Sequence, residues 1–163
     1  MERVKQSLKA SGDLKHRVAE TLSGEILEAA QTIRDRLASG GKLLLMGNGG
    51  SAADSQHIAA ELVGRFKKER AAIPAIALTV DSSSLTALGN DYGFEAIFSR
   101  QIEALATAKD AVMGISTSGN SQNVIRALNL ARNMGAATIG LVGHGGGNMK
   151  DYADICIVVP SDD

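Results

Sequence analysis

An apolar run that ends in a glycine-rich turn and then enters a helical pattern constrains this chain more than any other stretch. The run covers residues 43–46, the turn covers 47–51, and the helical pattern continues to Glu61. Glycine adopts positive φ easily and leaves no side chain between backbone amides and a ligand. Because a helix N-terminus also favours negative charge, this stretch predicts a strand, an anion-binding turn and a helix.

Similar apolar runs alternate with helical patterns along the rest of the chain. We expect strands over residues 42–46, 75–80, 111–115, 138–142 and 155–159, with helices over 51–64, 85–88, 95–106 and 122–133. The glycines at 89 and 93 are expected to break the chain between two of these helices. Strands alternating with helices through short turns predict a doubly wound, flavodoxin-like α/β fold with a five-stranded parallel sheet. Ligands of such sheets bind at the carboxyl ends of the strands.

Two amphipathic patterns precede the first strand. Apolar side chains recur at helical spacing over residues 2–22 and 25–37, and the sequence Ser-Gly-Gly at 39–41 ends the second pattern. We therefore expect one domain, 1–163, with N-terminal helices in 1–39 and an α/β core in 42–163. The two helices could pack on the sheet or on another subunit, and we favour a role in oligomerisation.

Charge and composition narrow the class of partner. A net charge of −1 gives no electrostatic footprint for nucleic acid or an acidic membrane surface. The N-terminus is charged and polar, unlike a signal peptide, and no apolar run approaches the ~20 residues of a membrane span. Cys156 is the one cysteine, so no internal disulfide can form, and its apolar neighbours predict a buried thiol. We expect a cytoplasmic protein.

A second polar turn follows the run at 111–115. Its hydroxyl side chains, four within six residues, are those of Ser116, Thr117, Ser118 and Ser121. Capping the following helix needs only one hydroxyl, whereas four hydroxyls and free amides can bind a dianionic phosphate without Lys or Arg. Phosphate binding is therefore the favoured interpretation. A nucleophilic serine is not favoured, because no Gly-x-Ser-x-Gly sequence is present.

The first turn also permits a dinucleotide site. Gly47, Gly49 and Ala52 fit the pattern G-x-G-x-x-A, and Asp81 ends the next predicted strand as a ribose-binding acid would. However, Asp81 lies 29 residues beyond Ala52, where about 20 are expected. The match is weak, and the absence of Gly-Lys-Ser/Thr excludes a P-loop.

His57 and Glu61 stand four residues apart on the first core helix, so their side chains share a face. Spacing alone leaves a site pair and a structural histidine equally open. Together with the anion-binding turn, the pair suggests a phosphorylated ligand. Its phosphate would bind at the turn, and its other end would react near the His57–Glu61 pair. The charged residues 65–70 that follow are typical of a solvated turn.

Several separated motifs together resemble one family. They are Gly47-Asn48-Gly49-Gly50-Ser51, His57-x-x-x-Glu61-Leu62-x-Gly64-Arg65, Gly89-Asn90-Asp91-Tyr92-Gly93-Phe94 and Gly114-Ile115-Ser116-Thr117-Ser118-Gly119-Asn120-Ser121. In this order they resemble the phosphoheptose isomerase family of the sugar isomerase (SIS) domain superfamily. The resemblance implies an aldose–ketose isomerase of bacterial heptose and lipopolysaccharide biosynthesis. Such an enzyme converts sedoheptulose 7-phosphate into D-glycero-D-manno-heptose 7-phosphate through an enediol. The resemblance also implies a homotetramer whose N-terminal helices form a central bundle.

The resemblance assigns roles to particular residues. Those matching the phosphate loop are Ser116, Thr117, Ser118 and Ser121. Those matching other substrate contacts are Asn48, Gly49, Gly50, Ser51, Asn90 and Asp91, with Asp91 near the sugar hydroxyls. Glu61 matches a catalytic acid/base, and His57 with Glu61 matches half of a zinc site that many members carry.

The resemblance also implies a segment that this sequence does not contain. Members of the family continue into a C-terminal helix that supplies a Gln and a His as further zinc ligands, the His being the second acid/base. This sequence stops at Asp163. We therefore expect a chain ending here to isomerise poorly and the full-length protein to be active.

Two alternatives remain beside the isomerase. One is a non-catalytic SIS protein that binds a sugar phosphate, such as the branch that binds the bacterial replication initiator. In that branch the position of Glu61 is not acidic, so this residue favours the enzyme. The other is a dinucleotide-dependent oxidoreductase, which the second polar turn does not favour.

Overall fold

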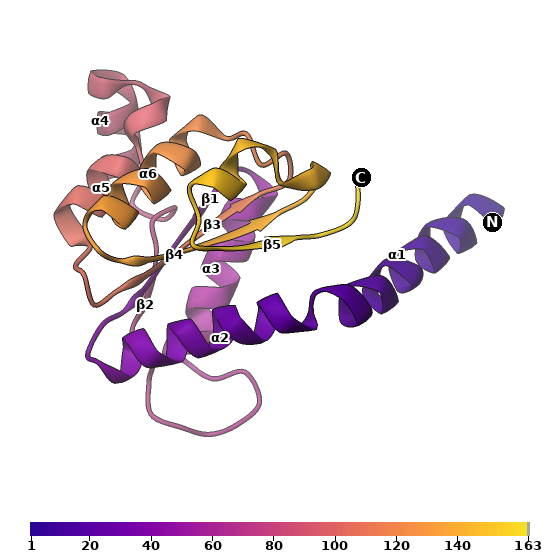
Figure 1. Ribbon diagram of the computed structural model, residues 1–163. Coiled ribbons are helices and arrows are strands. Elements are labelled where there is room, and N and C mark those ends of the chain that lie inside the picture. The colour runs from indigo at the N-terminus through magenta and orange to yellow at the C-terminus, as the bar shows by residue number, and fades with distance from the viewer. Residues whose placement is uncertain (163) are drawn as a thin grey trace.

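A parallel sheet forms the centre of the molecule, which we describe over residues 1–162 of a computed structural model (Figure 1). Its strands are β1 (Leu43–Gly47), β2 (Ala75–Ala77), β3 (Ala111–Ser116), β4 (Ala137–Val142) and β5 (Ile155–Val158). Their spatial order is β2-β1-β3-β4-β5, and all pairings are parallel. This is the flavodoxin-like order, which confirms the predicted fold class.

Helices cover both faces of the sheet because the side chains of each strand alternate between them. On one face, Leu44 and Met46 of β1 pack with α5 (Ser99–Leu105) and α6 (Gln122–Asn133). On the other, Leu43 and Leu45 face α3 (Gly50–Val63), and α2 (Ser23–Ala38) covers β4 and β5. The sheet is therefore buried on both sides, as continuous apolar strands predict.

The edge strand β2 and the segment after it differ from expectation. The strand ends at Ala77 rather than at residue 80, because the chain turns into α4 (Ser82–Tyr92). That helix runs through Gly89 and ends only at Gly93, whose φ is +83°. The helix predicted over 95–106 is divided into a short 3₁₀ turn, η1 (Phe94–Ala96), and α5.

The first helix, α1 (Glu2–Thr21), extends beyond the core as a continuation of α2 (Figure 1). It has no buried residue, and its apolar side chains Val4 and Leu8 are 61% and 71% exposed. Within residues 1–162, no helix combines the length and the apolar character that a membrane span requires.

Cys156 lies on β5, the second edge strand, and is half-buried rather than fully buried. Burial raises the pKa of its thiol, and the charge of Lys150 opposes that shift only in part. The thiol is therefore less reactive than an exposed one.

Candidate functional site

The first glycine-rich turn connects β1 to α3 and packs tightly on the end of β3. A Cβ at Gly47 would lie 2.7 Å from Ser51 Cβ and 2.9 Å from Ile115 O, so only glycine fits there. Gly49 has φ of +55°, and the N–H of Ser51 donates to the carbonyl of Asn48 at 3.0 Å. The turn thus places the start of α3 at the carboxyl end of β1, and the N–H groups of Ser51 and Ala52 bond within the turn itself.

The second polar turn connects β3 to α6 and is held from both sides. The hydroxyls of Ser116 and Ser121 lie 2.9 Å apart, and Gly119 has φ of +66°. From the 3₁₀ segment η2 (His144–Asp151), the N–H of Met149 donates to Gly119 O at 2.9 Å. The N–H of Asn148 donates to Asn120 Oδ1 at 3.0 Å. These two hydrogen bonds from η2 fix the shape of the turn.

The two turns enclose one small cavity of ≈ 210 Å³. The residues that line it are Asn48, Ser51, Ile115, Ser116, Thr117, Ser118 and Ser121. Six of these seven side chains are polar and uncharged, and the cavity lies at the N-terminus of α6. Hydroxyls at the positive end of a helix are suited to a phosphate group.

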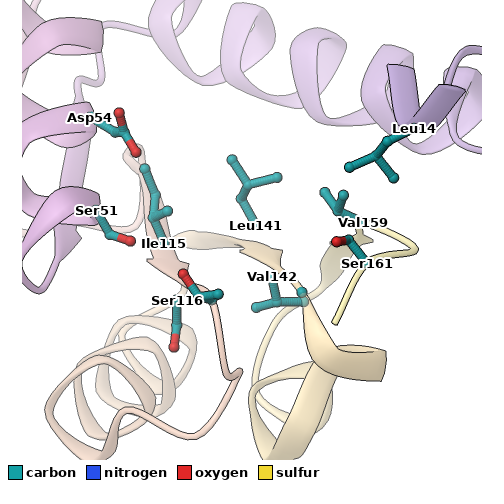
Figure 2. A pocket seen from close by; sticks show the side chains of 11 residues that line it. Leu14, Ser51, Asp54, Ile115, Ser116, Leu141, Val142, Val159 and Ser161 are labelled. Atoms are coloured by element: carbon teal, nitrogen blue, oxygen red, sulfur yellow. The ribbon is translucent and has the colours of Figure 1, made fainter. Parts of the chain in front are cut away.

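A second cavity of ≈ 240 Å³ shares Ser51, Ser116 and neighbouring residues with the first (Figure 2). Asp54 of α3 lies on one side of it, and Leu141 of β4 contributes to its apolar floor. Leu14, from α1, lies at its far side. The polar phosphate-type cavity therefore opens onto a larger space bordered by the N-terminal helix.

His57 and Glu61 share a face of α3, as their spacing predicts. Nε2 of His57 lies 3.6 Å from Oε1 of Glu61, and their side chains are 75% and 31% exposed. His57 and Glu61 stand six and ten positions after Ser51, so they lie ~9 Å and ~15 Å along the helix axis from the first turn. The pair is outside the cavity that the hydroxyls line.

The same two side chains fit half of a zinc site. Imidazole nitrogen and carboxylate oxygen are both normal zinc ligands, and tetrahedral zinc takes four. Among residues 1–162, however, no group of three His, Cys, Asp or Glu side chains is placed to hold a metal.

Arg70 departs from the prediction of a purely solvated turn. Its Nη2 donates to the carbonyl of Glu61 at 2.8 Å, and its Nη1 donates to that of Leu62 at 2.9 Å. The last carbonyls of a helix lack partners within the helix and favour a cation. Arg70 therefore caps α3 at the turn that carries Glu61.

Two further predicted site residues, Asn90 and Asp91, lie on α4. Nδ2 of Asn90 donates to Oδ1 of Asp91 at 2.8 Å, and both residues are exposed. Neither lines the two cavities described above. Within one chain, the structure does not bring them to the phosphate-type cavity.

Asp81, the residue that a dinucleotide site would need, is occupied otherwise. Its carboxylate accepts from the N–H and the hydroxyl of Ser84 at 3.0 and 2.7 Å, which caps α4. The backbone hydrogen bond from Ser84 is the main reason that the pKa of Asp81 lies below its usual value. Because its carboxylate caps α4, Asp81 does not take the role of the ribose-binding acid that a dinucleotide site requires.

Two residues of the site were missed from the sequence. Asp54 lies one helical turn after Ser51, so helical spacing could have placed it at the cavity. Asn123 is 3% exposed and bonds the side chain of Asn48. Nothing local in the sequence marks that contact, because its partners are 75 residues apart.

Known proteins match the chain along almost its whole length. A SIS domain family model matches residues 7–143. The phosphoheptose isomerase of Geobacter sulfurreducens is 58% identical over 156 residues, which are 96% of this chain and 82% of that protein. The chain belongs to the phosphoheptose isomerase family of SIS-domain proteins. The resemblance recognised in the motifs is thereby confirmed.

Solved structures of this family agree with the fold. A phosphoheptose isomerase from Neisseria gonorrhoeae superimposes with a TM-score of 0.93 at 42% identity, and one from Francisella tularensis with 0.95 at 37%. Each comparison covers 99% of this chain and 86% of the other. The N-terminal helices and the five-stranded core are therefore features of the family fold.

Proposed function

We propose that this protein is a phosphoheptose isomerase that converts sedoheptulose 7-phosphate into D-glycero-D-manno-heptose 7-phosphate. The observation that carries the proposal is a hydroxyl-lined cavity at a helix N-terminus, in a chain 58% identical to a phosphoheptose isomerase. The names of the relatives favour the enzyme over the regulator that binds a replication initiator. The pathway would be bacterial heptose and lipopolysaccharide biosynthesis, in the cytoplasm.

The phosphate would be bound by the second polar turn. Ser116 and Ser121, together with Thr117 and Ser118, offer hydroxyls to the phosphate oxygens, and the first amides of α6 add N–H donors. No Lys or Arg lines this cavity in the described part of the chain, so the helix dipole supplies the positive potential. The first turn, 48–51, would contact the adjoining sugar carbons, and Asn90 and Asp91 would contribute from a neighbouring part of the site.

Isomerisation requires a proton to move between adjacent carbons. A base removes the proton from the hydroxyl-bearing carbon next to the carbonyl while the carbonyl oxygen gains a proton, which gives an enediol. The former carbonyl carbon then gains a proton and the other oxygen loses its own, which forms the new carbonyl group. We assign Glu61 as one member of this pair, because its carboxylate is partly exposed and lies beside the imidazole of His57. The family resemblance places the second member, a His, in a C-terminal helix.

The test is turnover of sedoheptulose 7-phosphate by protein expressed from its complete gene, with Glu61→Gln as the variant. General acid–base catalysis contributes about 10²–10⁴-fold, so kcat should fall by that factor. Binding of inorganic phosphate should not change, because the phosphate turn is distant from Glu61. The control is Glu103→Gln, an exposed carboxylate on α5. A Glu61→Gln variant with wild-type kcat would exclude the assignment.

We also propose zinc as the metal that His57 and Glu61 help to hold. When bound, zinc would polarise the sugar oxygens. The expected stoichiometry is one ion per subunit, with the remaining ligands in the C-terminal helix that the resemblance to the family implies. Metal analysis of His57→Ala protein should show reduced zinc content at unchanged folding. Equal zinc in His57→Ala and wild type would contradict this ligand set.

The exposed apolar side chains of α1 support a homotetramer. Val4 and Leu8 lie on a helix that projects from the core, and both side chains are largely exposed in a single chain. Exposed apolar side chains of this kind mark surfaces that pack on another protein, here on other copies of the chain. Light scattering should give a tetramer for the wild type and smaller species for Leu8→Glu. The control, Lys9→Glu, changes charge at the next position of the same helix and should remain tetrameric.

A further inference from the structure

Two asparagine side chains connect the two turns that form the phosphate-type cavity. Nδ2 of Asn48 donates to Oδ1 of Asn123, and Nδ2 of Asn123 donates to Oδ1 of Asn48, both at 2.9 Å. Asn48 belongs to the turn after β1, and Asn123 to the first turn of α6. The reciprocal pair therefore connects the first turn, which we assign to the sugar, directly to α6, whose N-terminus we assign to the phosphate.

The two members of the pair have different surroundings. Asn123 is 3% exposed and does not line the cavity, whereas Asn48 is half-buried and does. A side-chain amide has two N–H groups and an oxygen with two lone pairs, of which this pair uses one of each. Asn48 thus keeps one N–H and one lone pair for a ligand.

The orientation of both amides follows from the backbone of α6. Oδ1 of Asn123 also accepts from the N–H of Val124 at 3.0 Å, so an NH₂ group cannot take that position. With the oxygen of Asn123 fixed, the facing atom of Asn48 has to be its nitrogen. The direction of the Asn48 amide is therefore determined by a residue that a ligand does not reach.

We propose that Asn123 is a positioning residue for the sugar end of the site. By fixing the Asn48 amide, it presents one donor and one acceptor in a set order to the hydroxyls next to the phosphate. Without Asn123 the amide can rotate, and part of the binding free energy is lost in ordering it. The inference rests on the proposed function, because it requires a sugar phosphate in the cavity.

The test compares two dissociation constants, for sedoheptulose 7-phosphate and for inorganic phosphate. Asn123→Ala should weaken binding of the sugar phosphate about tenfold, the equivalent of one neutral hydrogen bond, and leave inorganic phosphate within about twofold. The control is Asn129→Ala, an exposed asparagine on the same helix, which should change neither constant. Equal weakening of both ligands by Asn123→Ala would overturn the proposal, since it would indicate a general collapse of the turn.

A double-mutant cycle with Asn48→Ala separates positioning from a structural role. If Asn123 acts through Asn48, the double variant should bind the sugar phosphate no more weakly than Asn48→Ala alone. A tenfold loss on both backgrounds would overturn the proposal. Should Asn123→Ala fail to fold, Asn123→Leu has a similar shape and also removes both hydrogen bonds to Asn48. The same ratio of the two dissociation constants is then expected from that variant.

The side-chain amide signals of Asn48 in NMR spectra give a readout without ligand. In the wild type its two Nδ2 protons should be distinct and slow to exchange, and in Asn123→Ala they should exchange rapidly. Unchanged signals would overturn the positioning role, whatever the substrate proves to be. A wild type that binds phosphate but neither binds nor converts sedoheptulose 7-phosphate would instead contradict the proposed function.

Discussion

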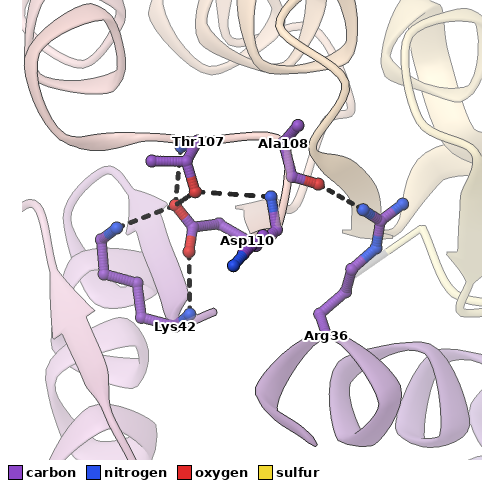
Figure 3. Close-up of polar contacts among 6 residues, drawn as sticks. Arg36, Lys42, Thr107, Ala108 and Asp110 are labelled. Carbon is purple, nitrogen blue, oxygen red and sulfur yellow. Dashed lines mark hydrogen bonds and ion pairs between the residues drawn. The ribbon is translucent and has the colours of Figure 1, made fainter. Parts of the chain in front are cut away.

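The two ends of the central strands each carry a polar cluster, and the clusters differ in how completely their hydrogen bonds are used. At the amino end, Asp110 is 1% exposed. Its carboxylate accepts from Nζ and N–H of Lys42, both at 2.8 Å, and from N–H and hydroxyl of Thr107 at 2.7 and 3.0 Å (Figure 3). Close by, Arg36 of α2 donates to the carbonyl of Ala108.

At the carboxyl end, the hydroxyls are directed into a cavity. Ser116 and Ser121 bond each other, but each hydroxyl can make further bonds, and no charged side chain from residues 1–162 lines the space. The carboxylate of the amino-end cluster accepts four hydrogen bonds from the protein itself, whereas the hydroxyls of the carboxyl-end cluster face a cavity. Donors that face a cavity, rather than polarity itself, therefore distinguish a binding site from a structural cluster.

The largest loss of stability should follow from removing Asp110, the carboxylate at the centre of the amino-end cluster. Asp110→Ala leaves the ammonium of Lys42 and the donors of Thr107 without their acceptor, and breaking such a buried pair costs about 3–5 kcal/mol of unfolding free energy. Urea unfolding measures this loss. The control is Asp13→Ala on α1, where the pair with Lys9 is exposed and should contribute less than about 1 kcal/mol. Inorganic phosphate binding by the folded fraction of Asp110→Ala should remain unchanged.

A substitution in the carboxyl-end cluster should instead weaken ligand binding while leaving stability almost unchanged. Ser116→Ala should weaken phosphate binding about tenfold, since a hydrogen bond to a charged ligand contributes about 1.5 kcal/mol or more. The unfolding free energy should change by about 1 kcal/mol or less, because the hydroxyl makes one neutral hydrogen bond, to Ser121, among the described residues. Calorimetric titration measures the affinity, and Ser83→Ala, an exposed serine on α4, is the matched control. If the Ser116→Ala protein were unstable yet bound phosphate normally, the carboxyl-end cluster would be structural like the amino-end cluster, and its assignment as a binding site would be wrong.

The parts of the fold that the sequence predicted are those set by local rules. Helix α6 begins and ends as expected: Ser121 is its N-cap residue, with extended backbone, and Gly135, with φ of +84°, follows it. The strand β1 is apolar throughout because both its faces are buried. The hydroxyl turn was predicted for the same kind of reason, since four hydroxyls lie together in the sequence before one helix.

The parts that the sequence did not predict depend on distant contacts. Gly89 continues α4 instead of breaking it, and a Cβ there would meet nothing closer than 3.8 Å. Arg70 caps α3 only because the following loop returns to the helix end. Asn123 is part of the site through a bond to a residue 75 positions away. No local pattern encodes such pairings, and only the folded chain reveals them.

The smallest predicted effect is a pH dependence that only the amino-end cluster should show. Burial raises the pKa of Asp110, but hydrogen bonds from Lys42 and Thr107 outweigh it and hold the pKa below its usual value. The native carboxylate therefore stabilises the fold above the unfolded pKa of about 3.9, and this stabilisation is lost as the pH falls through the native pKa. The unfolding free energies of wild type and Asp110→Asn should differ by about 1–2 kcal/mol between pH 5 and 7.

That difference should begin to shrink below about pH 4, where the carboxyl of the unfolded chain gains a proton, and should level off only below the native pKa of Asp110, where the native carboxyl is protonated and resembles the amide. Ser116→Ala provides the contrast, because no group titrates at its hydroxyl, so its small difference from the wild type should stay constant with pH. Urea unfolding from pH 3 to pH 7 measures both. If the Asp110→Asn difference were equally constant, the ion pair with Lys42 would contribute no more to the fold than a neutral hydrogen bond. The two ends of the sheet would then differ only in whether their donors are used, and not in charge.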